Sequence, residues 1–132
     1  GRVVAIDVES GNKMWKQDVS SFSGVSQGFG NVYVADEDGT VNAYLRNGQG
    51  LRWAQGALGY RGLSRPTPVS SYVAVGDLEG YVHLLTQVDG ALVGRVRVDS
   101  DGARADMLSD GNVLYVYGNS GELVAYEISA KN

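Results

Sequence analysis

Residues 72–80 read YVAVGDLEG, an apolar run that passes through a short polar segment to a glycine. This pattern is typical of a β-strand that enters a tight turn. Two other segments align with it without a gap, residues 31–39 (NVYVADEDG) and residues 113–121 (VLYVYGNSG), so that the closing glycines stand 41 residues apart. A fixed period of this length predicts an array of repeated structural units.

A second apolar run follows each of these glycines, namely TVNAYL, YVHLL and ELVAYEI, and the first six residues (GRVVAI) form a fourth copy. Each unit is therefore expected to be a hairpin, whose turn glycine supplies a positive φ. Further turns at Ser10-Gly11, Asn47-Gly48 and Asp89-Gly90 lead into a third strand. A fourth, shorter strand is expected before each hairpin, near residues 24–26, 67–70 and 106–109. Four strands in about 41 residues are typical of one blade of a β-propeller.

The apolar runs predict sheets that are covered on both faces. In residues 32–35, 73–75 and 114–117 almost every position is apolar, whereas a strand with one wet face would alternate. A β-sandwich is the alternative, although its repeats would be less regular. We expect no substantial helix, about thirteen strands and a partial propeller of about three and a half four-stranded antiparallel blades. Residues 1–20 would form a half blade, 23–57 and 66–98 two whole blades, and 104–128 an incomplete last blade.

Composition limits the possible partners. The 132 residues carry a net charge of −4, which argues against nucleic acid as a partner because nucleic acids require a basic face. The chain has no cysteine, so disulfides and thiolate metal sites are excluded. The sequence starts in mid-pattern and ends on a short polar tail, residues 129–132. We therefore expect a C-terminal fragment of a longer propeller.

The first repeat spells Ala5-x-Asp7-x-x-Ser10-Gly11-x-x-x-Trp15. It resembles the repeat of the pyrroloquinoline-quinone-type propellers, in which a tryptophan docks between blades. The second copy keeps the alanine and the tryptophan, as Ala43 and Trp53, and the third has Leu84 and Gly94 at these positions. The resemblance implies that Trp15 and Trp53 are structural docking residues; stacking on a ligand is the alternative. A buried indole also needs an acceptor for its N–H, which a backbone carbonyl of the next blade can provide.

Residues 30–36 (GNVYVAD), 65–69 (RPTPV) and 72–83 (YVAVGDLEGYVH) are more specific. In order and spacing they are similar to the C-terminal half of the BamB family, the propeller lipoproteins of the outer-membrane barrel-assembly machinery of Gram-negative bacteria. The resemblance covers essentially the whole chain and implies an eight-bladed ring. It also implies a non-enzymatic scaffold at the periplasmic face of the outer membrane that helps to insert outer-membrane proteins. This scaffold would bind the POTRA domains of BamA and other barrel-assembly subunits, and a lipid outside these residues would anchor it. The family's main docking surface lies upstream of this segment.

A quinoprotein dehydrogenase is the alternative function. Such an enzyme needs a calcium-bound quinone with carboxylate and asparagine ligands, and no such set is recognisable in the sequence. His83, the only histidine, lacks partners at metal-ligand spacing. The acidic turns at residues 36–39 and 99–102 lack the remaining ligands of a calcium loop and are expected to be solvated. We therefore predict no enzymatic activity, no catalytic residue, no cofactor and no metal.

The loop at residues 57–66 (ALGYRGLSRP) is the most distinctive connection. Tyrosine and arginine are common anchors in protein interfaces. Four of its residues are therefore candidates for a protein interface: Tyr60, Arg61, Leu63 and Arg65. The alternative is a connection that crosses from an outer strand to an inner one, with Tyr60 and Leu63 packed on the blade.

Incomplete blades leave open edges. The expected last blade stops after the strand at residues 122–128, and the first has only two strands. Open strand edges carry unpaired backbone groups, so we expect the chain to self-associate. The strand at residues 13–19 of one copy would complete the last blade of another.

Overall fold

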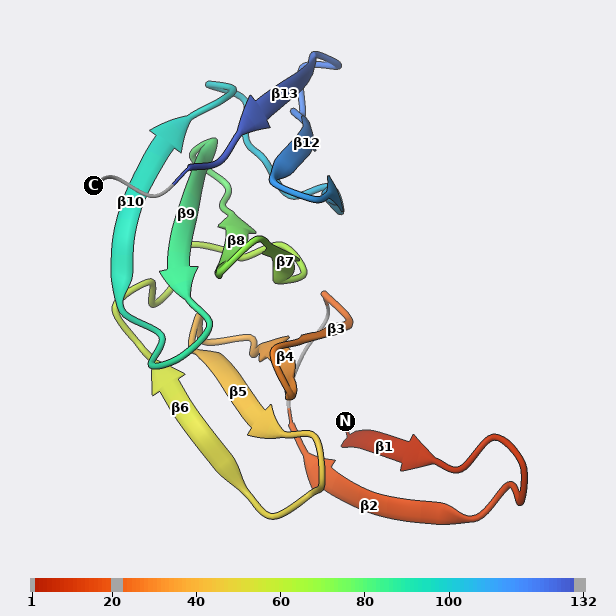
Figure 1. Ribbon diagram of the computed structural model, residues 1–132. Helices are drawn as coiled ribbons and strands as arrows, with labels where there is room; N and C mark the ends of the chain where they lie inside the picture. The colour runs from red at the N-terminus through yellow and green to blue at the C-terminus, as the bar shows by residue number, and fades with distance from the viewer. Residues whose placement is uncertain (1, 20–22, 130–132) are drawn as a thin grey trace.

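The computed structural model describes residues 2–19 and 23–129, which form thirteen strands in four antiparallel sheets and no helix. Figure 1 shows the sheets following one another around an arc, with β6 and β10 on the outer rim and β3 and β7 toward the inside. The prediction of an all-β chain with propeller-like blades is confirmed. Within the described residues, no helix is present that is long and apolar enough to cross a membrane.

The first sheet is a hairpin of β1 (Arg2–Ile6) and β2 (Lys13–Asp18). The second sheet has four strands in chain order, with each strand hydrogen-bonded to the next: β3 (Val25–Gly28), β4 (Asn31–Ala35), β5 (Val41–Leu45) and β6 (Leu51–Gln55).

The third sheet repeats this order with β7 (Thr67–Val69), β8 (Tyr72–Gly76), β9 (Tyr81–Thr86) and β10 (Leu92–Arg97). The last sheet contains three described strands, β11 (Leu108–Asp110), β12 (Val113–Tyr117) and β13 (Leu123–Glu127). Because each sheet is a meander in which consecutive strands pair, short hairpin turns join the strands, and this explains the regularly spaced turn residues in the sequence.

The repeated glycines close the hairpins between the second and third strands of each blade. Gly39, Gly80 and Gly121 have φ values of 93°, 91° and 95°, a conformation that glycine adopts without steric cost. Gly80 also permits a close approach between segments, because a Cβ added to it would lie 1.5 Å from the carbonyl oxygen of Asp99. These turns therefore shape both the hairpins and the contacts with the segments that follow them.

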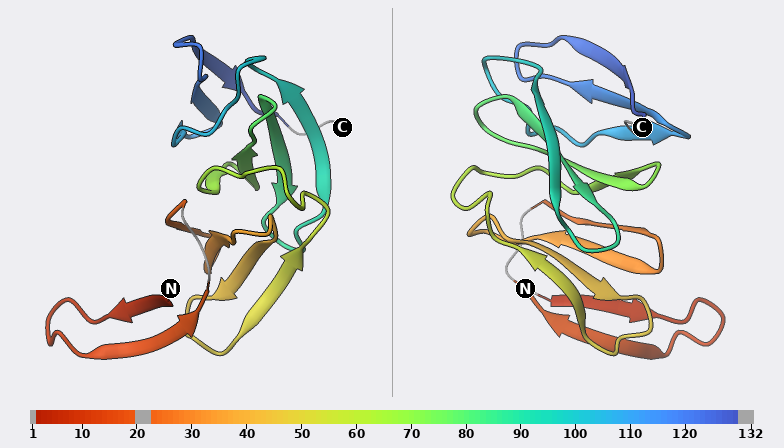
Figure 2. Two further views of the ribbon diagram at one scale, coloured as in Figure 1. Left: turned by 180° about the vertical axis from the view of Figure 1, so that it is seen from behind. Right: turned by 60° about the vertical axis from the view of Figure 1, so that its left-hand side comes forward.

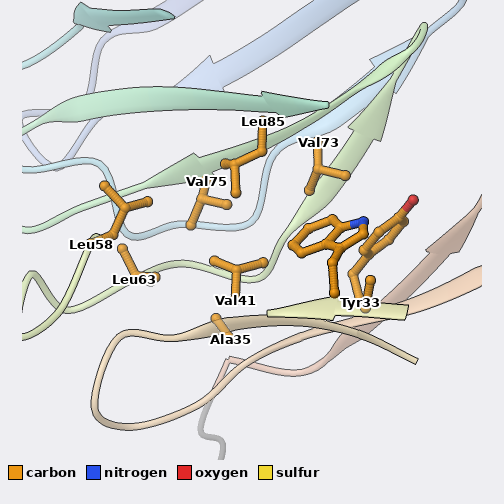
Figure 3. Packing of buried hydrophobic residues seen from close by; sticks show 10 residues of the cluster. Tyr33, Ala35, Val41, Leu58, Leu63, Val73, Val75 and Leu85 are labelled. Carbon is orange, nitrogen blue, oxygen red and sulfur yellow. The ribbon is translucent and has the colours of Figure 1, made fainter. Parts of the chain in front are cut away.

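The core lies between successive sheets, which stack in chain order (Figure 2). One cluster joins the second and third sheets, where Val41 of β5 lies across from Val75 and Leu85 (Figure 3). A second cluster joins the third and last sheets through Val82 of β9 and Leu114 of β12. Hydrophobic burial between sheets is thus the main force that orders the array.

The last sheet departs from the expectation that both faces are covered. Buried and exposed residues alternate along β12, and Tyr117 is 52% exposed, whereas β8 is buried at four consecutive positions. The reason is that β12 packs on the third sheet through only one of its faces, the face that carries Leu114 and Val116. The apolar side chains on its other face remain in contact with solvent.

Candidate functional site

Trp15 connects the first sheet to the second. It lies on β2 opposite Ala5, and its indole Nε1 donates a hydrogen bond of 2.9 Å to the carbonyl oxygen of Arg46. Its ring lies against Gly48, where an added Cβ would come within 2.5 Å of the indole. The half-buried indole therefore occupies a place on the second sheet that only glycine leaves open.

Trp53 makes the same connection from the second sheet to the third. It lies on β6 opposite Ala43, and its Nε1 donates a hydrogen bond of 3.0 Å to the carbonyl oxygen of Gln87. Gly90 leaves space for the ring, and the ring centroid lies 5.9 Å from that of Tyr33. With only 7% of its surface exposed, Trp53 is more deeply buried than Trp15.

A buried polar network surrounds this contact. The amide of Asn31 donates to the Tyr33 hydroxyl at 3.1 Å and to the Gln87 carbonyl at 3.0 Å. The Tyr33 hydroxyl in turn donates to Oε1 of Gln87 at 2.7 Å, and the Gln87 amide donates to the Ser70 carbonyl at 2.8 Å. Burial raises the pKa of Tyr33. The network was not predicted from the sequence, because Asn31 and Tyr33 lie more than 50 residues from Gln87.

His83 takes part in a second buried cluster. Its Nε2 lies 2.8 Å from Oδ2 of Asp77, a fully buried carboxylate that also pairs with Arg61 at 3.2 Å. Burial alone would raise the pKa of Asp77, but hydrogen bonds from His83, from the Tyr81 N–H and from Arg61 hold it below its usual range. The cluster gives His83 a structural partner on its own hairpin.

The two acidic turns differ in their surroundings. In the first, Oδ1 of Asp36 accepts a hydrogen bond from the Thr40 N–H at 3.0 Å. In the second, Asp99 is buried and accepts hydrogen bonds from the Ser120 N–H at 2.9 Å and from its hydroxyl at 2.5 Å, which lower the pKa of Asp99. The prediction of a solvated turn is therefore wrong for Asp99, which connects the third sheet to the last.

Comparison with known proteins identifies the family. A family model described as "Outer membrane protein assembly factor BamB" matches residues 1–55. The chain is 53% identical over 97% of its length to the protein of that name from Pseudomonas aeruginosa and covers 34% of that protein. The chain belongs to the BamB family.

Other members of the BamB family agree with this assignment. The protein of the same name from Marinobacter adhaerens is 34% identical over the whole chain, which covers 34% of that protein. The crystal structure of BamB from Moraxella catarrhalis superposes with a TM-score of 0.82 at 26% identity and covers 97% of this chain and 38% of that one. The chain thus spans about a third of the length of the curated relatives it matches.

The four loop residues that were proposed as an interface in this BamB-family chain have different environments. Tyr60 is 90% exposed and has a φ of 61°, a strained conformation for a bulky residue. Arg61 pairs with Asp77, and Arg65 lies 3.8 Å from Asp106. Leu63 is buried in the core between the second and third sheets, so we leave it out of any proposed partner surface.

The described residues contain no cluster of three or more histidine, aspartate or glutamate side chains arranged to hold a metal ion. Sequence reasoning missed the Asp77–His83 pair, although a signal was present. Asp77 follows β8 directly, and His83 lies opposite Val75 on the paired strand β9, so the two side chains share one hairpin.

Proposed function

We propose that this chain is part of a non-enzymatic scaffold subunit that takes part in the assembly of β-barrel proteins in the outer membrane. The observation that carries the proposal is the 53% identity with the P. aeruginosa protein, which is named an outer membrane protein assembly factor. The residues would form the last blades of an eight-bladed ring at the periplasmic face of the outer membrane, with the lipid anchor elsewhere in the protein.

The histidine and the buried aspartates could in principle serve in catalysis, but each is engaged in contacts that stabilise the fold. This supports a role in binding. His83 and Arg61 both contact the buried carboxylate of Asp77, and Asp99 holds the turn at Ser120. Tyr60 is the member of the loop best placed to meet a partner, because it is exposed and held in a strained conformation, a combination often found at functional sites. We assign it an accessory contact beside a main docking surface on earlier blades.

A full-length BamB-family protein that carries these residues is expected to capture purified POTRA domains of BamA in a pull-down. Tyr60→Ala should weaken the capture by about tenfold, since truncating an anchor residue costs more than about 1 kcal/mol. Val88→Ala, which changes an exposed side chain in another turn, is the matched control. The same protein, incubated with pyrroloquinoline quinone and calcium, should show no dehydrogenase activity in a dye-reduction assay. An intact protein that ignores POTRA domains would remove the proposed partner.

The chain of 132 residues by itself is expected to associate with further copies. In the described residues, β2, β10 and β13 each have one unpaired edge, and Ile6, Met14 and Leu123 are exposed apolar side chains near open edges. Strand β2 of one copy beside β13 of another would complete the last sheet, and two-fold symmetry would repeat the contact. Light scattering over a dilution series should report masses above the monomer. A monomer that persists at high micromolar concentration would contradict the expectation.

A further inference from the structure

The third repeat has a glycine, Gly94, at the position that Trp15 and Trp53 occupy in the first two repeats. Trp15 and Trp53 each face an alanine on the paired strand, whereas the third equivalent, Gly94 of β10, faces Leu84 of β9. A Cβ added to Gly94 would meet no atom within 4 Å. The position that holds an indole in the first two repeats is therefore open space in the third.

This space belongs to a cleft of about 490 Å³ between the third and last sheets, within the range of ligand pockets, about 300–1,000 Å³. Its walls are mainly aliphatic and aromatic, and they include Val82, Leu84, Gly94, Val96, Tyr126 and Ile128. Leu84 packs on the core cluster between these two sheets, and Gly94 is its partner on the neighbouring strand. Position 94 therefore faces the last sheet, just as Trp53 of the second sheet faces the third sheet. An aromatic ring is the group that this repeat places here.

The last sheet also provides the equivalent acceptor. The two indole N–H groups donate to the carbonyls of Arg46 and Gln87. Each of these two residues also donates its own backbone N–H to a carbonyl 16 residues earlier in the chain. Ile128 donates to Asn112 by the same offset, and Ile128 lines the cleft. A carbonyl oxygen has two lone pairs, and that of Gln87 accepts from both Asn31 and Trp53. The Ile128 carbonyl is thus placed to receive an indole N–H.

We propose that this cleft binds an aromatic side chain, an indole above all, that an extended segment of a partner polypeptide presents. One of its flanking strands, β10, is the outer edge strand of the third sheet among the described residues, so its backbone groups are available to pair with such a segment. The inference is drawn from the repeat geometry alone and does not depend on the proposed function.

The chain itself supplies the probe. Residues 50–57 (GLRWAQGA) contain β6 with its tryptophan, and a peptide of this sequence can be compared with the same peptide carrying alanine for Trp53. Titrated into the ¹⁵N-labelled chain, the tryptophan peptide should cause saturable shifts of the Gly94, Val96 and Ile128 amide signals. The alanine peptide should bind at least about tenfold more weakly, because it loses the aromatic surface that the cleft buries. Free indole should shift the same signals.

Two substitutions test the place of binding. Gly94→Trp should fill the cleft from within, abolish peptide binding and raise the melting temperature, whereas Val88→Trp adds an exposed indole in a turn and should leave binding unchanged. Gly94→Val narrows the cleft with a smaller side chain and serves if the tryptophan variant does not fold. Equal binding of the two peptides, unchanged signals at the three positions, or undiminished binding by a folded Gly94 variant would each overturn the proposal.

Discussion

Trp53→Ala is expected to lower the free energy of unfolding by about 3–5 kcal/mol, the usual loss for a buried aromatic. The indole is 7% exposed, it packs between the second and third sheets, and its N–H bonds to the Gln87 carbonyl. Its removal leaves a cavity and leaves the Gln87 carbonyl with the Asn31 amide as its one remaining side-chain donor among those described. Urea denaturation followed by circular dichroism measures the difference.

Three further variants identify the cause of this loss. Trp53→Phe keeps an aromatic ring but loses the hydrogen bond, and should cost less than the alanine variant. Trp15→Ala should also be destabilising but less so, because Trp15 is only half-buried. Leu51→Ala, an exposed position on the same strand, is the matched control and should change stability by less than about 1 kcal/mol. A Trp53→Ala variant that unfolds together with the parent would contradict the docking role.

Asp77→Ala is expected to cost about 3–5 kcal/mol, as is usual when one partner of a buried ion pair is removed. The fully buried carboxylate pairs with Arg61 and His83 and accepts the Glu79 and Tyr81 N–H groups at 2.9 and 3.0 Å. Its loss leaves two turn donors and a buried imidazole without their acceptor. Glu79→Ala is the control, since Glu79 lies 3.8 Å from the same arginine but is 67% exposed, and exposed pairs contribute less than about 1 kcal/mol.

The pH dependence of unfolding provides an independent test of Asp77. Its pKa in the folded chain lies below the usual aspartate value of about 3.9. The carboxylate therefore stabilises the fold above that value, and this contribution disappears as the pH falls through the folded pKa. The difference in stability between the parent and Asp77→Asn should thus be larger at pH 7 than at pH 2. A difference independent of pH would show that the charge of Asp77 is not what stabilises the hairpin.

Local features of the sequence were sufficient to predict the positions of the strands and turns. The pattern of YVAVGDLEG depends on a continuous apolar run and on one glycine with positive φ, Gly80, and both are properties of neighbouring residues. The equivalence of Trp15 and Trp53 was visible for the same reason, because a repeat places equivalent residues in equivalent surroundings. The sequence also showed that the third repeat has Gly94 in place of the tryptophan, although it did not reveal that this glycine leaves a cleft between two sheets.

Tertiary structure decided which groups meet and which faces remain open. The acceptors of the two indoles lie 31 and 34 residues away, and no short-range pattern specifies them. Within a single loop, Leu63 is buried while Tyr60 is exposed, because one side chain falls between the second and third sheets and the other does not. The cleft at Gly94 exists for the same reason: strand and turn formation depend on adjacent residues, whereas burial depends on what a distant segment places against each face.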